Sequence, residues 1–250
     1  MKNSVKKIMT IDSLITVRST SGRLFEKCFL PFGECNVIEH VIRRAKYFSF
    51  KPLLCTTLDQ EDDRLVRIAE NEKIPFYRGS TVDKLMRWKN ACEKFEINKF
   101  LTIDGDDPFF DKSLGKLSLS LLGDNNFISH PNKLPYEGCV GYSISYDLIK
   151  KACELKKSKD TEMMWHFLEP VPSLRKKELE VNNYDLNIRL TLDYIEDYWL
   201  ILFVLRNLGP FAEIDKIINL FKNNPDLHKM NWFRNIEYKQ NHNLKVNNQY

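Results

Sequence analysis

The sequence predicts an α/β fold in which a largely parallel sheet carries helices on both faces. In the first half of the chain, short apolar stretches alternate with stretches that are apolar at helical spacing, a pattern typical of strand–helix units. Three of the predicted strands end on polar clusters, at residues 18–27, 78–83 and 104–107. Because the carboxyl ends of parallel strands meet at one edge of a sheet, functional groups are expected to gather there.

Local signals define the elements of the first half. The apolar stretch at 11–17 predicts a first strand, and Asn36 with Glu39 forms a capping-box pattern that opens a helix over 37–48. Residues 59–63 are expected to cap a second helix, since positions 65, 66, 68 and 69 are apolar at helical spacing. The remaining predictions are strands at 52–57, 74–77 and 99–103 and a helix at 82–95.

The second half is less regular. Strands are predicted at 126–130, at 139–145 as an antiparallel edge, and at 188–192, where the strand ends on Asp193. Helices are predicted at 147–155, 161–168, 198–208 and 214–221, and Gly209-Pro210 is a stop signal for the third of them. His40 is expected on a helix surface, whereas His166 is either a packed histidine or a substrate contact.

Composition bounds the class of protein. The 250 residues favour a single domain over 1–222, followed by a polar tail at 223–250 that is expected to be mobile or to lie on the surface. The formal charge of +4 is too small to indicate a nucleic-acid partner. Without a long apolar stretch or a signal-peptide core, a cytoplasmic protein with no membrane partner is expected. The six cysteines lack CxxC spacing, which predicts reduced thiols rather than a zinc site or disulfides.

The loop after the first predicted strand has the composition of a phosphate-binding loop. It combines Ser, Thr and Gly with the cations Arg18, Arg23 and Lys27. A strand, a basic Ser/Gly loop and a helix place backbone N–H groups and positive charge where a phosphate can bind. Neither GxxxxGK[ST] nor GxGxxG occurs in this loop, so an ordinary strand-to-helix connection with surface charges is equally compatible with it.

Two acidic strand ends, Asp106 and Asp193, are candidates for one metal site. Two carboxylates together with a triphosphate are a usual way to hold Mg²⁺, which keeps some water and takes its other ligands from phosphate. Each aspartate has an alternative interpretation as a turn residue or helix cap. For Asp104 and Asp107 that alternative is the favoured one.

Five blocks of sequence in register resemble the CMP-sugar cytidylyltransferases, the family of the acylneuraminate and Kdo (3-deoxy-manno-octulosonate) enzymes, and most of all the branch of spore-coat polysaccharide biosynthesis. The blocks span about residues 8–205 and read VRSTSGRLFEK at 17–27 with EHVIRR at 39–44, EDD at 61–63, FYRGS at 76–80 before Asp83, TIDGDDP at 102–108, and RLTLD at 189–193 before Glu196 and Asp197. The resemblance implies a nucleotide-diphospho-sugar-transferase fold: a Rossmann-like mixed sheet flanked by helices, with a small antiparallel flap that often forms a homodimer.

The resemblance also implies a reaction, in which CTP and a sugar hydroxyl give a CMP-sugar and pyrophosphate. The implied nucleotide site comprises Arg18, Ser21, Arg23 and Lys27 around the triphosphate, and Arg78, Ser80 and Asp83 around cytosine and ribose. The implied catalytic residues are Arg18, Lys27, Asp106 and Asp193, the two aspartates holding Mg²⁺. The sugar would lie against Tyr136 and Gly138, with Glu162 or His166 reaching it.

The first loop departs from the family pattern at three positions. The usual Gly is replaced by Thr20, and the usual Pro-Gly before the lysine by Phe25-Glu26. A β-branched residue does not readily adopt positive φ, and a glutamate beside Lys27 would repel a triphosphate unless it points away. Two alternatives therefore stand beside a sugar cytidylyltransferase: an enzyme of the same fold that acts on a phosphonate or polyol phosphate, and a non-catalytic nucleotide-binding protein.

Overall fold

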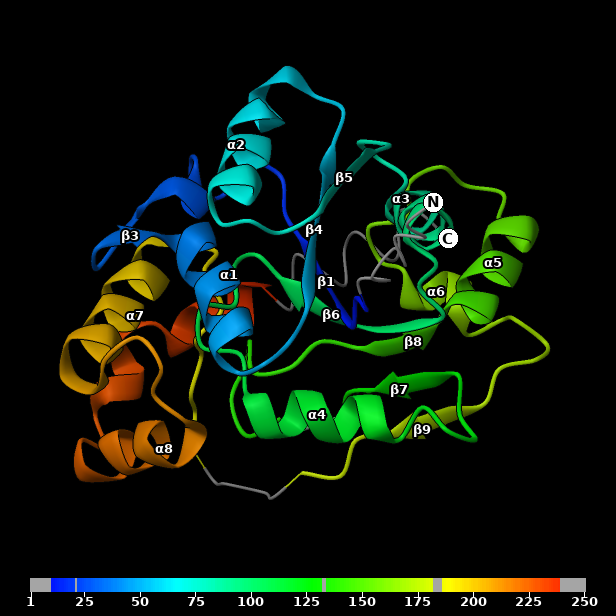
Figure 1. Ribbon diagram of the computed structural model, residues 1–250. Helices are drawn as coiled ribbons and strands as arrows, with labels where there is room; N and C mark the ends of the chain where they lie inside the picture. Colours follow the sequence, from blue (N-terminus) through cyan, green and yellow to red (C-terminus); the bar gives the residue numbers. More distant parts are fainter. Residues whose placement is uncertain (1–9, 21, 132–133, 182–185, 239–250) are drawn as a thin grey trace, which may run out of the picture.

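A mixed sheet runs through the centre of the computed structural model, which describes residues 10–20, 22–131, 134–181 and 186–238 (Figure 1). Within these residues, seven strands pair in the order β5-β4-β1-β6-β8-β7-β9. The first four in this order are mutually parallel, and β8 is antiparallel to both β6 and β7. The strands are β1 Ser13–Thr16, β4 Pro52–Thr57, β5 Phe76–Gly79, β6 Lys99–Asp104, β7 Phe127–Ser129, β8 Ser143–Ser145 and β9 Lys176–Glu178.

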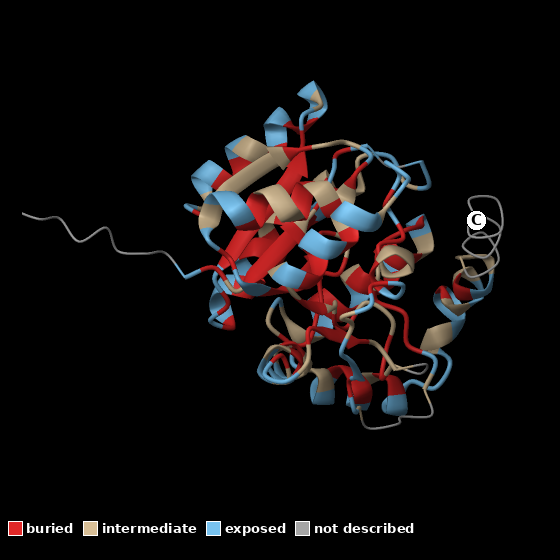
Figure 2. Ribbon diagram, turned by 90° about the vertical axis from the view of Figure 1, so that its right-hand side faces the viewer, coloured by how far each residue is buried: buried red, intermediate tan, exposed pale blue. Residues whose placement is uncertain are grey.

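Helices cover both faces of the sheet, as predicted. One core lies under α1 Val37–Tyr47, α2 Asp63–Asn71, α4 Lys112–Ser120, α7 Ile195–Leu208 and α8 Ile214–Asn223. The other lies under α3 Lys84–Phe95, α5 Tyr146–Leu155 and α6 Trp165–Leu168. Successive strand residues point to opposite faces, so Leu14 joins the α3–α5 core and Ile15 the α1–α2 core. Figure 2 shows the buried strands between helices whose outer faces are exposed.

Capping explains where several helices begin. Asn36 accepts a hydrogen bond from the Glu39 N–H and Glu39 returns one to the Asn36 N–H, which confirms the predicted capping box of α1. Single side-chain caps open α3, α4 and α5, at Asp83, Asp111 and Ser145. Short 3₁₀ turns lie at Lys27–Phe29 (η1), Gln60–Asp62 (η2) and Leu227–Met230 (η3).

A small antiparallel pair lies beside the main sheet. Pro31–Phe32 (β2) pairs with Cys35–Asn36 (β3) around Gly33, whose φ of 67° is in the region that favours glycine. With the mixed sheet and its flanking helices, this pair completes the fold class that the sequence predicts.

The predicted strand at 188–192 is wrong. In this segment only Arg189 makes a β-bridge, an isolated one to Glu137. Its neighbours bond to loops instead: Leu190 N–H donates to the Glu137 carbonyl and Leu192 N–H to the Asp106 carbonyl. The segment is largely buried, but these hydrogen bonds join it to loops rather than to a strand of the sheet.

The second half differs from the predictions in three further ways. The predicted edge strand at 139–145 contracts to β8, which lies between β6 and β7 and is therefore interior. Helix α4 and strand β9 lie outside the sequence predictions. Residues 232–238 of the predicted polar tail are helical, and Asn231 and Asn235 are buried. None of the helices in the described part of the chain combines the length and apolar composition needed to cross a bilayer.

The expectation for His40 is also wrong, because its side chain is only 2% exposed. Helix α1 lies between the sheet and α7, so a histidine on its inner face is enclosed by aromatic rings, with Phe32 at 4.5 Å between ring centroids. One ring nitrogen, Nε2, lies 2.8 Å from the Pro108 carbonyl and donates to it. Burial lowers the pKa of His40 to about 4.

Neutral His40 gives a specific pH dependence of stability. Below pH 6.5 this histidine becomes protonated in the unfolded chain, whereas in the folded chain it stays neutral down to about pH 4. The free energy of unfolding therefore falls as the pH drops. We expect a loss of about 2 kcal/mol at pH 5 relative to pH 7.5, measured by urea unfolding. His40→Gln removes this part of the pH dependence, whereas His228→Gln, at a half-exposed histidine, retains it. Equal pH slopes for His40→Gln and wild type would contradict the assignment.

Candidate active site

The carboxyl ends of the parallel strands bring three loops to one edge of the sheet. In the register of the sheet, Thr16 at the end of β1 lies opposite Cys55 of β4 and Asp104 of β6. The loop that follows β1 therefore meets those after β4 and β6. This is the edge at which open α/β sheets bind their ligands.

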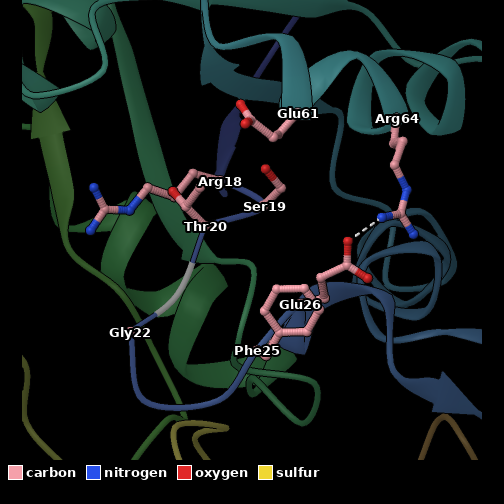
Figure 3. A pocket seen from close by; sticks show the side chains of 8 residues that line it. All are labelled: Arg18, Ser19, Thr20, Gly22, Phe25, Glu26, Glu61 and Arg64. Carbon is pink, nitrogen blue, oxygen red and sulfur yellow. Dashed lines mark hydrogen bonds and ion pairs between the residues drawn. The ribbon is translucent and has the colours of Figure 1, made fainter.

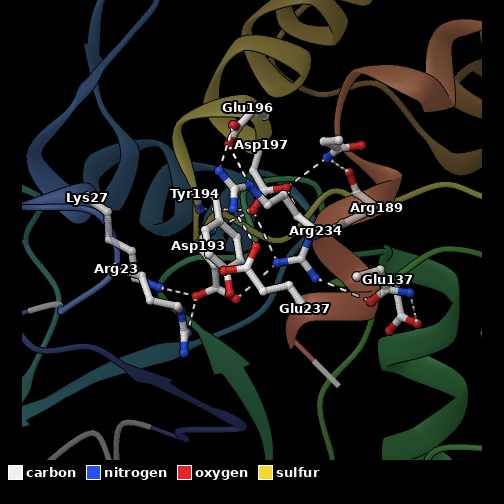
Figure 4. A network of polar contacts seen from close by, with 12 residues as sticks. Arg23, Lys27, Glu137, Arg189, Asp193, Tyr194, Glu196, Asp197, Arg234 and Glu237 are labelled. Atoms are coloured by element: carbon white, nitrogen blue, oxygen red, sulfur yellow. Dashed lines mark hydrogen bonds and ion pairs between the residues drawn. The ribbon is translucent and has the colours of Figure 1, made fainter. Parts of the chain in front are cut away.

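A cluster of two cations and two carboxylates forms at this edge, and Figure 4 shows its two cations, Arg23 and Lys27, directed toward Asp193. Lys27 Nζ lies 2.5 Å from Asp106 Oδ2 and 2.9 Å from Asp193 Oδ1. Arg23 Nη2 lies 2.5 Å from the same Asp193 oxygen. The structure thus brings together Arg23 and Lys27 of the first loop, Asp106 after β6 and Asp193 before α7, all of which the sequence predicts as site residues.

The charges in this cluster support one another. Burial would raise the pKa of the Asp193 carboxyl, but the charges of Lys27 and Arg23 outweigh it, so this pKa is well below its usual range. Burial would likewise lower the pKa of Lys27, and the two aspartates raise it instead. Burial raises the pKa of Asp106 despite Lys27. A doubly paired ammonium and an ionised Asp193 make this edge a preorganised charged site.

A buried carboxylate, Asp62, fixes the start of the first loop. Its Oδ1 accepts hydrogen bonds from the Ser19 N–H and hydroxyl, both at 2.7 Å. Its Oδ2 accepts from the Thr56 hydroxyl and from the Thr57 N–H and hydroxyl at 2.6–3.0 Å. Burial would raise the pKa of Asp62, but these donors lower it. Asp62 lies in the EDD block of the sequence, but only the tertiary structure shows that it joins the first loop to the end of β4.

A cavity of about 570 Å³ opens beside the first loop (Figure 3). It is lined by Arg18, Ser19, Thr20, Gly22, Phe25, Glu26, Glu61 and Arg64. Phe25 stands at its rim and is 82% exposed. A volume of this size suits a small organic ligand, and the lining includes two arginines and two glutamates that can take part in polar recognition.

The departures of this loop from the family pattern are accommodated locally. Thr20 is not among the described residues with positive φ, so its β-branch carries no backbone strain. Glu26, at the position of the family's glycine, adopts the left-handed conformation with φ 47° and ψ 33°. Its carboxylate pairs with Arg64 rather than turning to Lys27. Ser21, a predicted nucleotide ligand, lies outside the described residues.

Three predicted nucleotide ligands make contacts with other residues of the protein. Arg78 donates to the Thr57 and Asp59 carbonyls and pairs with Asp63 at 2.6 Å. The Ser80 hydroxyl accepts from the Asp83 N–H. Asp83 caps α3 and pairs with Lys156. These residues shape the loops around the edge of the sheet, and whether they touch a nucleotide stays a prediction.

Of the four predicted acceptor residues, Tyr136 and Gly138 have structural roles, whereas Glu162 lies beside the first loop and His166 lies in α6. Tyr136 is buried, and its hydroxyl donates to the Phe109 carbonyl. Gly138 has φ 82°, and a Cβ there would lie 2.8 Å from Asp107 Oδ1, so glycine is required for packing. Glu162 is exposed and lies 3.6 Å from Arg18, which joins the predicted acceptor side to the first loop. His166 lies in α6 beside Trp165, 5.6 Å between ring centroids.

The donor set fits a divalent cation such as Mg²⁺. Asp106 and Asp193 supply hard carboxylate oxygens that already converge on one cation, the ammonium of Lys27. The described residues contain no group of three or more His, Cys, Asp or Glu side chains that could hold a metal. Two protein carboxylates are sufficient for Mg²⁺, because it takes its remaining ligands from phosphate and water.

Comparison with known proteins identifies the fold. No family model matches the chain. An uncharacterized protein of Methanocaldococcus jannaschii is 28% identical over 230 residues, 89% of this chain and 95% of the relative. A cytidylyltransferase structure from Leptospira borgpetersenii aligns with a TM-score of 0.80 and 24% identity, covering 88% of this chain and 96% of its own. The chain has the cytidylyltransferase fold.

Two more distant structures share this cytidylyltransferase fold. The CMP:2-keto-3-deoxy-manno-octonic acid synthetase complexed with CTP aligns with a TM-score of 0.59 and 13% identity, covering 79% of this chain and 99% of its own. Rv0371C of Mycobacterium tuberculosis, in a complex with manganese, aligns with a TM-score of 0.56 and 16% identity, covering 77% and 98%. One of these proteins was thus solved with a cytidine nucleotide and the other with a divalent metal.

The role of Asp62 can be tested by Asp62→Asn. This substitution replaces a carboxylate that accepts five hydrogen bonds and turns an NH₂ group toward buried donors. We expect the free energy of unfolding to fall by about 3 kcal/mol in urea titrations at pH 7. Asp226→Asn, at an exposed aspartate, is the matched control and should stay within about 0.5 kcal/mol of wild type. A loss below about 1 kcal/mol for Asp62→Asn would mean that the first loop does not depend on this carboxylate.

Proposed function

We propose that this protein is a CTP-dependent cytidylyltransferase that transfers CMP to a sugar and releases pyrophosphate. The observation that carries the proposal is the convergence of Arg23 and Lys27 with Asp106 and Asp193 at the ligand-binding edge of a cytidylyltransferase fold. Such a cluster suits a polyphosphate and a divalent cation. The acceptor we propose is an acidic or modified sugar for a surface polysaccharide, as in the spore-coat branch that the sequence resembles.

The choice of CTP rests on two supports. Structural relatives with this fold are cytidylyltransferases, and one was solved in complex with CTP. The cavity beside the first loop has the Glu61 carboxylate in its lining. Cytosine presents an exocyclic amine as donor, and a carboxylate can accept a hydrogen bond from it.

The chain's own residues supply positioning and charge. Arg18, Arg23 and Lys27 would neutralise the triphosphate, which lowers the electrostatic cost of bringing an acceptor oxygen to the α-phosphate. Asp106 and Asp193 would hold Mg²⁺, which on binding neutralises phosphate charge and polarises the phosphoryl group. Lys27, which lies beside both carboxylates, would be placed to pair with the phosphates. Glu162, next to Arg18, lies on the side from which the acceptor would approach.

The geometry of the first loop favours an active enzyme over a non-catalytic binding protein. The two features that motivated the non-catalytic alternative were Thr20 and Glu26. Thr20 shows no positive φ, and Glu26 directs its charge to Arg64. A non-sugar acceptor such as a polyol phosphate remains the second candidate for the substrate, because the acceptor side of the site is the least similar part of the sequence. A homodimer stays a prediction from the resemblance, and a cytoplasmic location stays a prediction from the sequence composition.

The proposal is tested by pyrophosphate release from CTP with a panel of acidic sugars, modified sugars and polyol phosphates. We expect release that requires CTP and Mg²⁺ with at least one sugar. Asp106→Asn and Asp193→Asn should each lower the rate by at least about 100-fold, since each removes a carboxylate from the proposed metal site. Asp124→Asn, at an exposed aspartate, is the control.

Two results would contradict the proposal. Unchanged turnover in both aspartate variants would remove the metal assignment. If wild-type protein fails to bind CTP in calorimetric titrations both with and without Mg²⁺, CTP is not the nucleotide substrate.

A further inference from the structure

Asp193 is held from its far side by a buried arginine (Figure 4). Oδ1 of Asp193 forms ion pairs with Arg23 and Lys27, whereas Oδ2 accepts a hydrogen bond from Arg189 Nη2 at 3.1 Å. Arg189 is 1% exposed. Its guanidinium also grips Asp197 through two bonds, Nε to Oδ1 at 2.9 Å and Nη2 to Oδ2 at 3.1 Å. A paired guanidinium of this kind has a fixed orientation, so it fixes the plane of the Asp193 carboxylate.

Asp197 holds the backbone of the same residue. It is fully buried, and its Oδ2 accepts from the N–H groups of Asp193 and Tyr194, both at 3.0 Å. These bonds also cap the first turn of α7. Main chain and side chain of Asp193 are therefore set by one Arg189–Asp197 pair. With Oδ2 engaged by Arg189, only Oδ1 faces the cluster.

The C-terminal segment at 231–238 completes this arrangement. Asn231 is fully buried, and its Nδ2 donates to the Arg189 carbonyl at 2.9 Å and to Asp197 Oδ1 at 2.8 Å. Arg234 pairs with Glu196 of α7 at 2.8 Å and lies over the Tyr194 ring. At the end of the segment, the Tyr238 ring lies 5.5 Å from the Arg23 guanidinium and 5.3 Å from that of Arg189.

We propose that segment 231–238 is a positioning element of the reaction centre: Asn231 locks the Arg189–Asp197 pair so that Asp193 offers a single oxygen, Oδ1, to the metal, and Tyr238 holds Arg23 toward the phosphates. This inference rests on the proposed function. Packing alone would be served by apolar side chains, whereas here buried amide, guanidinium and carboxylate groups form a chain that ends on a proposed metal ligand. Groups that orient a metal ligand typically change metal affinity 10–100-fold when they are replaced.

The test separates metal binding from nucleotide binding. CTP is titrated calorimetrically into full-length wild type and Asn231→Leu, without Mg²⁺ and at saturating Mg²⁺. Leucine has the same number and branching of side-chain heavy atoms as asparagine but no amide donors. We expect Mg²⁺ to strengthen CTP binding in wild type, and Asn231→Leu to lose at least about 10-fold of that gain while its Mg²⁺-free affinity stays within about 2-fold. Asn224→Leu, which removes an exposed amide from the end of α8, is the matched control and should behave as wild type.

Other outcomes overturn the inference. If Asn231→Leu keeps the full Mg²⁺ gain, or loses affinity equally with and without Mg²⁺, the segment has only a structural role. Those outcomes leave the proposed function intact, because wild type still binds CTP with Mg²⁺. If the CTP affinity of wild type is the same with and without Mg²⁺, the assignment of Asp106 and Asp193 as metal ligands fails, and the inference fails with it.

A second variant covers the case in which Asn231→Leu does not fold. Tyr238 is only partly buried, so Tyr238→Leu should fold. It removes the ring from beside Arg23, and we expect CTP affinity to fall about 3–10-fold. Unchanged affinity in Tyr238→Leu would overturn the inference.

Discussion

The ammonium of Lys27, shared between Asp106 and Asp193, is the interaction on which the site depends. The two carboxylates come from the end of β6 and from the segment before α7, and without a cation between them they would repel each other in a partly buried setting. Their closeness requires that the first loop deliver Lys27 to the same point. The fold therefore holds these charged groups together in ion pairs, in the arrangement on which the proposed nucleotide and metal site rests.

The first loop places Lys27 between the two aspartates although its sequence departs from the family pattern. Contacts of its side chains with other parts of the chain make up for these departures, and a residue-by-residue comparison does not reveal them. Glu26 replaces a glycine yet keeps the left-handed backbone that a glycine would provide. Such a conformation is costly for a non-glycine residue and persists where its surroundings stabilise it. Here the Glu26 side chain pairs with Arg64, and Asp62 holds the loop's beginning against β4. The contacts of the described loop residues are thus compatible with the phosphate-binding role that we propose.

Support for the site extends beyond the block of resemblance. The Arg189–Asp197 pair is encoded within that block, but Asn231, which completes it, comes from a stretch whose composition suggests only a polar tail. Buried polar residues of this kind are costly unless each is paired, so their presence next to Asp193 indicates that the geometry of this carboxylate is closely specified. Residues 231–238 and the edge of the sheet that carries Asp193 thus form one physical unit.

The sequence by itself determined the strand–helix alternation of the first half, the capping box of α1 and the meeting of Arg23, Lys27 and Asp106 at one edge, whereas Asp193 reaches this edge at the end of a segment that is not a strand. Hydrophobic periodicity and cap residues are local signals, and the parallel topology turns strand ends into neighbours. Only the tertiary structure decided that His40 is buried, that 188–192 is not a strand and that β8 is interior, because each depends on which surface packs against it. The contacts of Asp62 and Asn231 belong to the same class: they span 43 and 34 residues, and no local pattern encodes which partner a buried polar side chain will meet.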